Sequence, residues 1–161
     1  FPEEPLNLSA ADGFGYFPAE INQTLNGGDY TILRKLGWGP RSSTWLAKEA
    51  DGDRTLHFAV QAFTVATSKE VEARVLPIFQ TKLSAGNWIL FPYFYESFWE
   101  KSVHGEHLCL ALGAYGLPFS DVLRDAANGG RAGLSVHVVQ YTSSCLLQTL
   151  TRLHDIKVMH G

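Results

Sequence analysis

The residues with the clearest chemical potential form a glycine-rich hairpin. Residues 36–46 read Leu-Gly-Trp-Gly-Pro-Arg-Ser-Ser-Thr-Trp-Leu, so Gly37 and Gly39 are separated by a single residue. Glycines at this spacing expose the backbone and let its N–H groups approach a phosphate closely. Most Gly-x-Gly pairs are ordinary turns, so the chemistry depends on which elements follow this glycine hairpin and at what distance.

Alternating apolar residues predict five strands around and after the glycine hairpin. They cover residues 30–36, 43–49, 56–63, 93–99 and 107–112. Between the third and fourth strands, Ser68 is a plausible N-cap for a helix over 68–83, which Pro77 should kink or end. A five-stranded antiparallel sheet with one helix is an α+β arrangement.

The chain is expected to have four parts. They are an extended arm over 1–29, an α+β unit over 30–112, a hinge-like linker over 113–118 and a helical part over 119–161. In the last part, Ser135 should cap a long helix that runs to about His154. The residues of its broad apolar face are Val136, Val139, Leu146, Leu147, Leu150 and Leu153.

The order of these elements resembles the amino-terminal lobe of protein kinases. In that fold a glycine hairpin is followed by a Val-Ala-Ile-Lys strand and then by a helix that carries a glutamate. Here the strand reads Phe58-Ala59-Val60-Gln61, and Glu72 matches the glutamate. The resemblance implies that residues 30–112 are a kinase-like small lobe and that 119–161 are the first helices of a truncated large lobe.

More narrowly, the chain resembles the SR-protein kinase family of Ser/Thr kinases and its fungal relatives. The matching strings are Arg34-Lys35-Leu36-Gly37-Trp38-Gly39 with Ser42, Trp45-Leu46-Ala47, His107-Leu108-Cys109-Leu110, Leu153-His154, Val158-Met159-His160-Gly161, Gly15-Tyr16-Phe17-Pro18 and Leu25-Asn26-Gly27. The similarity covers nearly the whole chain from about Gly13. Because substrate choice in that family depends on large-lobe features absent here, we do not expect its Arg-Ser-rich substrates to carry over.

Gln61 is the main departure from the kinase pattern. The resemblance implies a lysine here, which would hold the nucleotide phosphates and pair with Glu72. A neutral amide lacks the charge that makes such hydrogen bonds about twice as strong. Glu72 is then expected to stay solvated or to pair with another cation, for which the candidates are Arg41, Lys69 and Arg74. Arg41 at the hairpin tip either reaches a phosphate in the lysine's place or is an ordinary surface arginine.

The resemblance also implies which residues would line a nucleotide site. Ser42 stands where a third glycine is usual, Thr44 replaces an apolar residue over the adenine, and Leu112 falls at the gatekeeper position before the hinge. The whole set expected to contact a bound nucleotide is Gly37, Gly39, Ser42, Thr44, Ala59, Gln61, Glu72, Leu112, Gly113 and Tyr115. ATP is therefore a possible, weakly held ligand.

No catalytic residue is expected within this chain. His160-Gly161 resembles the start of the kinase catalytic loop, in which an aspartate that accepts the substrate proton comes next. The metal-binding asparagine and the Asp-Phe-Gly motif have no match either. We therefore expect no complete metal site, and the six histidines show no metal-ligand spacing.

Composition narrows the partners and the compartment. The net charge of −3 comes without a basic patch, so neither nucleic acid nor an anionic membrane is an expected partner. No apolar run is long enough to span a bilayer. Cys109 and Cys145 lie in apolar segments and are expected to be small buried thiols, which suits a reducing, intracellular location in cytoplasm or nucleus.

Three interpretations follow from the sequence. The first is a catalytically inactive, pseudokinase-like module that binds a protein partner or associates with itself through the 135–154 helix, whose apolar stripe needs a cover. The alternative is the ATP-binding half of a Ser/Thr protein kinase whose catalytic half lies beyond residue 161. A degenerate product that keeps the fold without a selected role is the third.

Overall fold

The computed structural model describes residues 3–51, 54–83, 90–129 and 133–158. The chain divides into two compact units. The first comprises Phe1–Gly86 with Pro92–Ala114, and the second comprises Asn87–Phe91 with Tyr115–Gly161. The first unit holds the sheet and the second holds two helices, so each is described separately.

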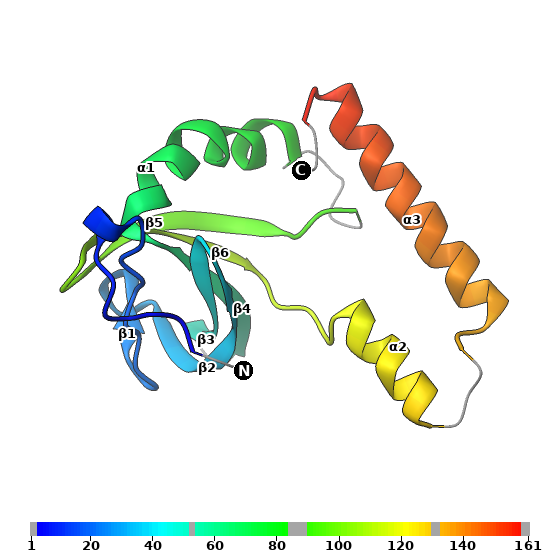
Figure 1. Cartoon of the computed structure of the whole chain (residues 1–161), viewed down its shortest axis with the longest axis horizontal. Helices are drawn as coiled ribbons and strands as arrows, with labels where there is room; N and C mark the ends of the chain where they lie inside the picture. The colour runs from blue at the N-terminus through cyan, green and yellow to red at the C-terminus, as the bar shows by residue number, and fades with distance from the viewer. Residues whose placement is uncertain (1–2, 52–53, 84–89, 130–132, 159–161) are drawn as a thin grey trace. The chain divides into compact units, whose positions relative to one another are not determined.

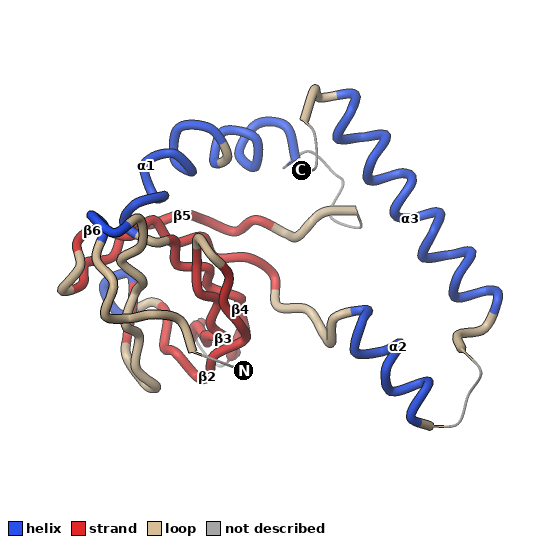
Figure 2. Tube along the Cα trace, in the orientation of Figure 1, coloured by secondary structure: helices blue, strands red, loops and turns tan. Residues whose placement is uncertain are grey.

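The first unit is built on one six-stranded antiparallel sheet in the order β1-β2-β3-β4-β6-β5 (Figures 1 and 2). The strands are β1 (Thr24–Leu25), β2 (Tyr30–Gly39), β3 (Ser42–Asp51), β4 (Arg54–Phe63), β5 (Phe94–Ser102) and β6 (Gly105–Gly113). All five expected strands are present and are longer than their patterns indicated. The sixth, β1, belongs to the expected arm, where it pairs with the start of β2.

The described residues form three α-helices, two short 3-10 helices and one π-helical segment. They are α1 (Val65–Arg74), α2 (Phe119–Asn128), α3 (Val136–Asp155), the short 3-10 helices η1 (Ala10–Asp12) and η2 (Asn26–Gly28), and the π-helical segment η3 (Ile78–Leu83). The cap of α3 is confirmed, because Ser135 Oγ accepts a hydrogen bond from Val138 N at 3.4 Å. None of the described helices has the length and hydropathy that crossing a bilayer requires.

The expected cap of the first helix was wrong. Helix α1 begins at Val65, and its N-cap position is Thr64, whose backbone is extended. Ser68 lies inside the helix, is buried, and donates its hydroxyl hydrogen to Thr64 O at 2.9 Å. The same hydroxyl oxygen accepts from Leu108 N at 2.9 Å, so Ser68 ties α1 to β6. As expected, the helix is interrupted near Pro77, since α1 ends at Arg74 and the π-helical η3 follows from Ile78.

The sheet buries a different apolar cluster on each face, because successive side chains of a strand point to opposite sides. On one face, Phe17 and Leu25 of the arm pack on residues such as Val60 and Ala62 of β4. On the other face, Phe63 of β4 and Leu108 and Leu110 of β6 pack against α1 and the residues after it. The arm therefore covers one face, and α1 covers part of the opposite face.

His107 is a fully buried polar residue on the arm side of the sheet. Its Nδ1 lies 2.8 Å from Phe63 O, and its Nε2 lies 2.7 Å from Ser102 Oγ. Because a carbonyl can only accept, Nδ1 carries the hydrogen and Nε2 of the neutral ring accepts from the serine. Burial lowers the pKa of His107, since it disfavours the charged ring more than the bond to Phe63 favours it.

His107 should make folding stability depend on pH. The lowered pKa means that the unfolded chain binds a proton more readily, so stability is full above the ordinary histidine pKa of about 6.5 and falls as the pH drops below it. His107→Gln should cost about 1–2 kcal/mol at neutral pH and flatten that decline. The measurement is urea unfolding between about pH 7 and about pH 5.

The exposed His57 supplies the matched control. His57→Gln should leave both the stability and its pH dependence as in the parent chain. A decline in His107→Gln as steep as in the parent would contradict the assignment of this pH dependence to the buried ring.

Candidate functional site

Apart from Gly113 at the end of β6, the predicted site residues of the sheet lie on a single face. In the β2–β3 hairpin Gly37 is opposite Thr44 and Gly39 is opposite Ser42. Thr44 is in turn opposite Gln61 of β4. Directly paired residues of antiparallel strands share a face, so these side chains and glycine positions point the same way. The pairing thus brings together residues far apart in the sequence.

The same face continues across β4 and β6. Ala59, another of the residues expected to contact a nucleotide, lies opposite Leu112, the expected gatekeeper. This is the face opposite the arm, since Val60 and Ala62 alternate with the site residues and are buried on the other side. Thr44, Ala59, Gln61 and Leu112 are only half-buried, so these residues are partly open to solvent. Leu112 also packs against the apolar cluster beside α1.

Gly37 and Gly39 leave open space above the backbone. A Cβ added at either position would meet no atom within 4 Å, and neither glycine has a positive φ. The turn therefore does not need glycine for its conformation at these two positions. Their effect is to leave the backbone of the glycine hairpin uncovered, as close approach of a ligand requires.

Gln61 is held by the glycine hairpin itself. Its Nε2 donates a hydrogen bond to Ser42 Oγ at 2.9 Å, which joins two of the predicted site residues. The interaction is between neutral groups, so the position that the kinase resemblance gives to a lysine carries no charge. The residues fit the apolar and backbone contacts of a nucleotide better than they fit its negative charge.

Glu72 does not meet Gln61 through any interaction that the structure records. Its carboxylate lies 3.6 Å from Lys69 Nζ, one of the three partners considered for it. The side chains of Lys69 and Glu72 are 74% and 42% exposed, so this ion pair contributes little to stability. Lys69 Nζ also lies 4.1 Å from the centroid of the Trp99 ring.

The other two candidate cations both bind a different acid. Arg41 Nη2 lies 2.6 Å from Glu70 Oε2, and Arg74 Nη1 lies 3.3 Å from Glu70 Oε1. The Arg41 side chain is thus directed to Glu70 of α1. An arginine engaged in this way is a poor replacement for the missing strand lysine.

The two expected hinge residues fall into different units. Gly113 ends β6, and its N–H donates to Tyr93 O at 2.8 Å, so this donor is already used within the sheet. The backbone N–H of Gly113 is therefore not free to bind a nucleotide. Tyr115 belongs to the second unit, where its side chain is 66% exposed.

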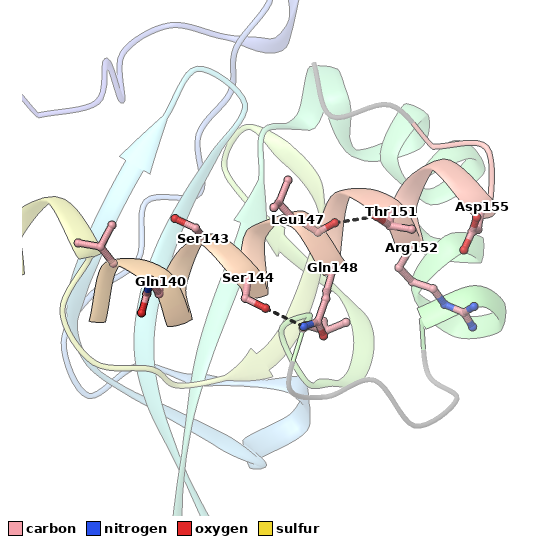
Figure 3. Close-up of a pocket in the computed structure, with 10 residues that line it drawn as sticks. Gln140, Ser143, Ser144, Leu147, Gln148, Thr151, Arg152 and Asp155 are labelled. Atoms are coloured by element: carbon pink, nitrogen blue, oxygen red, sulfur yellow. Dashed lines mark hydrogen bonds between the residues drawn. The ribbon is translucent and has the colours of Figure 1, made fainter. Parts of the chain in front are cut away.

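A groove in the structure lies elsewhere, along α3. It has a volume of about 680 Å³ and is lined by residues of α3 together with Leu90 (Figure 3). Gln140, Ser143, Ser144 and Gln148 give it a polar side. None of the predicted nucleotide-site residues lines this groove, so it is not the nucleotide site. Among the described residues, no cluster of histidine, cysteine, aspartate and glutamate could hold a metal ion.

Sequence reasoning missed the residues that hold the tip of the glycine hairpin. Arg41 O accepts hydrogen bonds from Thr64 N at 2.9 Å and from Thr67 Oγ1 at 3.1 Å. Tyr16 Oη donates to Gly39 O at 2.8 Å. A threonine directly before a helix is a capping signal, but nothing in the local sequence indicates that the partner of Thr64 is a turn more than twenty residues earlier.

Comparison with known structures defines the class of fold. A solved crystal structure of a kinase domain matches with a TM-score of 0.67 and 16% identity, over 88% of this chain and 39% of that chain. The chain therefore has a protein kinase-like fold, and it comprises the small lobe and the start of the large lobe. No protein-family model matches the chain.

Among curated proteins, the chain is similar to the serine/threonine-protein kinase SRPK of Physarum polycephalum. The two are 25% identical over 150 residues, which cover 91% of this chain and 34% of the relative. The chain thus spans about a third of the length of the relative that it matches. This relationship agrees with the resemblance to SR-protein kinases in the sequence.

The open space at Gly37 and Gly39 predicts that alanine is tolerated there. Gly37→Ala and Gly39→Ala should each change the free energy of unfolding by less than about 1 kcal/mol, because ordinary φ angles and free space impose no strain. Gly15→Ala is the matched comparison, since Gly15 has a φ of 78° and a Cβ there would lie 3.3 Å from the Val65 side chain.

Gly15→Ala should therefore cost about 1–3 kcal/mol. Urea unfolding of the three variants measures the difference. Equal destabilisation by Gly39→Ala and Gly15→Ala would contradict this, because it would show that the fold itself requires glycine in the hairpin.

Proposed function

We propose that this chain is a pseudokinase-like module that does not transfer phosphate and acts by binding protein. The observation that carries the proposal is the hydrogen bond from Gln61 to Ser42 at the position expected for lysine. Phosphoryl transfer depends on positioned charge that stabilises the transition state. A neutral amide, itself engaged with a serine hydroxyl, does not supply that charge.

The apolar face of α3 supports a role in protein binding. Among the described residues of α3 none is buried. The large apolar residues Leu146, Leu147 and Leu150 are 59%, 65% and 40% exposed. The better-covered side of the helix is instead the one with Thr142, Cys145 and Thr149. An exposed apolar stripe of this kind is typical of an interaction surface.

A second copy of the chain is the occupant that we propose for this stripe. From Val136 to Thr151 the helix contains no aspartate, glutamate, lysine or arginine. Two such helices can pack together without burying an unpaired charge, which would otherwise oppose association. A twofold dimer places the same apolar residues of both copies against each other.

Analytical ultracentrifugation tests this surface directly. The parent chain should show a monomer–dimer equilibrium across about a hundredfold range of concentration. Leu146→Lys should weaken the dimer at least about tenfold, because it brings a charge into the apolar contact. Gln148→Lys adds the same charge on another side of α3 and should leave the equilibrium nearly unchanged.

A parent chain that remains monomeric over the whole range would contradict self-association. Equal weakening by the two lysine variants would assign the effect to overall charge and not to the apolar stripe. Circular dichroism of each variant excludes loss of the helix as the cause.

The second candidate function is the ATP-binding half of a Ser/Thr protein kinase. It is favoured by the open backbone at Gly37 and Gly39 and by the half-buried face formed with Ala59 and Leu112. The transcript beyond the codon for Gly161 separates the two candidates. A continuing aspartate followed later by Asp-Phe-Gly would support the kinase half, whereas a stop codon would support the separate module.

A further inference from the structure

Helix α1 is attached to the sheet by contacts other than the kinase ion pair. In the kinase pattern a lysine of the strand binds a glutamate of the helix, but here Gln61 binds Ser42 and Glu72 binds Lys69. Even so, the start of α1 is closely held. The donors of its first turn show which segments hold it, because the first N–H groups of a helix have no partner within the helix.

The arm caps α1 with backbone carbonyls. Val65 N donates to Gly15 O at 2.9 Å, and Ala66 N donates to Phe14 O at 3.2 Å. No side-chain cap is present at Thr64. Gly15 has a φ of 78° and lies against Val65 so closely that an added Cβ would crowd it, which explains why glycine is needed at this contact.

The tip of the glycine hairpin is bound to the same helical turn. Arg41 O accepts from both Thr64 N and Thr67 Oγ1, while the Arg41 guanidinium pairs with Glu70. The hydrogen bonds to Arg41 O require a defined backbone geometry. The ion pair between Arg41 and Glu70 is about half-exposed and contributes less to stability. The Pro40–Arg41 turn is thereby attached to α1 at its backbone as well as its side chain.

Tyr16 closes the arrangement by joining the arm to the hairpin. Its hydroxyl donates to Gly39 O at 2.8 Å, and its ring is 1% exposed. The ring contacts Trp38 edge-on and stacks on Phe14, each with centroids 6.0 Å apart. Near the start of the arm, buried Glu4 binds Lys35 of β2 and accepts from Ser43 Oγ at 3.3 Å.

We propose that this three-way junction locks the glycine hairpin and α1 into one arrangement and replaces the lysine–glutamate ion pair as their connection. The junction consists of Phe14–Tyr16 of the arm, the Pro40–Arg41 turn and Thr64–Thr67 at the start of α1. All of its bonds form within the chain, so the connection needs no nucleotide. The hairpin tip and the first turn of α1 should consequently open together rather than separately.

Hydrogen–deuterium exchange of the full chain tests this coupling. Tyr16→Phe removes only the hydroxyl that binds Gly39 O, and Thr67→Val removes one donor to Arg41 O. Exchange at backbone amides reports local opening. Tyr16→Phe should speed exchange about fivefold in the first turn of α1 as well as in residues 38–42, and Thr67→Val should do the same from the other side.

Tyr141→Phe serves as the control for loss of a tyrosine hydroxyl, since Tyr141 is an exposed residue of α3. It should change exchange in neither segment. The proposal is wrong if Tyr16→Phe speeds exchange only in residues 38–42 and Thr67→Val only in the first turn of α1. The hairpin and α1 would then open independently. The outcome does not depend on whether the chain binds nucleotide or dimerises.

Discussion

A neutral hydrogen bond from Gln61 to Ser42 determines how this kinase-like sheet differs from the kinase pattern. It joins β4, near the end of the strand, to the glycine hairpin at the point where the kinase pattern places a charge. Glu72, which the kinase pattern pairs with this position, lies beside Lys69 instead. A kinase-like fold that lacks this charge has to position its helix by other contacts and has a weakened means of stabilising phosphoryl transfer.

Some of those contacts come from the arm, which does more than cover apolar surface. Tyr16 and Phe17 bury one face of the sheet, while Phe14 and Gly15 supply carbonyls to the start of α1. The opposite face remains half-open along Thr44, the sheet glycines and Leu112. The sheet therefore keeps the fold of a kinase-like small lobe, although Gln61 and Ser42 on this face bind each other.

Patterns within short segments predicted most of the fold. Alternation located five strands, and Ser135 with its apolar periodicity located α3. Strand order then placed the site residues of the sheet other than Gly113 on one face. A two-residue strand such as β1 shows no alternation, and Ser68 is a good cap by type, so the start of α1 was misplaced. The partners of Arg41 and Tyr16 depend on long-range contacts that no local pattern contains.

The most direct test of the central claim is a calorimetric titration of the parent chain and Gln61→Lys with ATP, with and without Mg²⁺. A missing charge at position 61 predicts no binding by the parent below about 1 mM ATP and binding about tenfold tighter after Gln61→Lys. Micromolar binding by the parent chain would contradict the account, because it would show that the glycine hairpin holds the phosphates without a lysine.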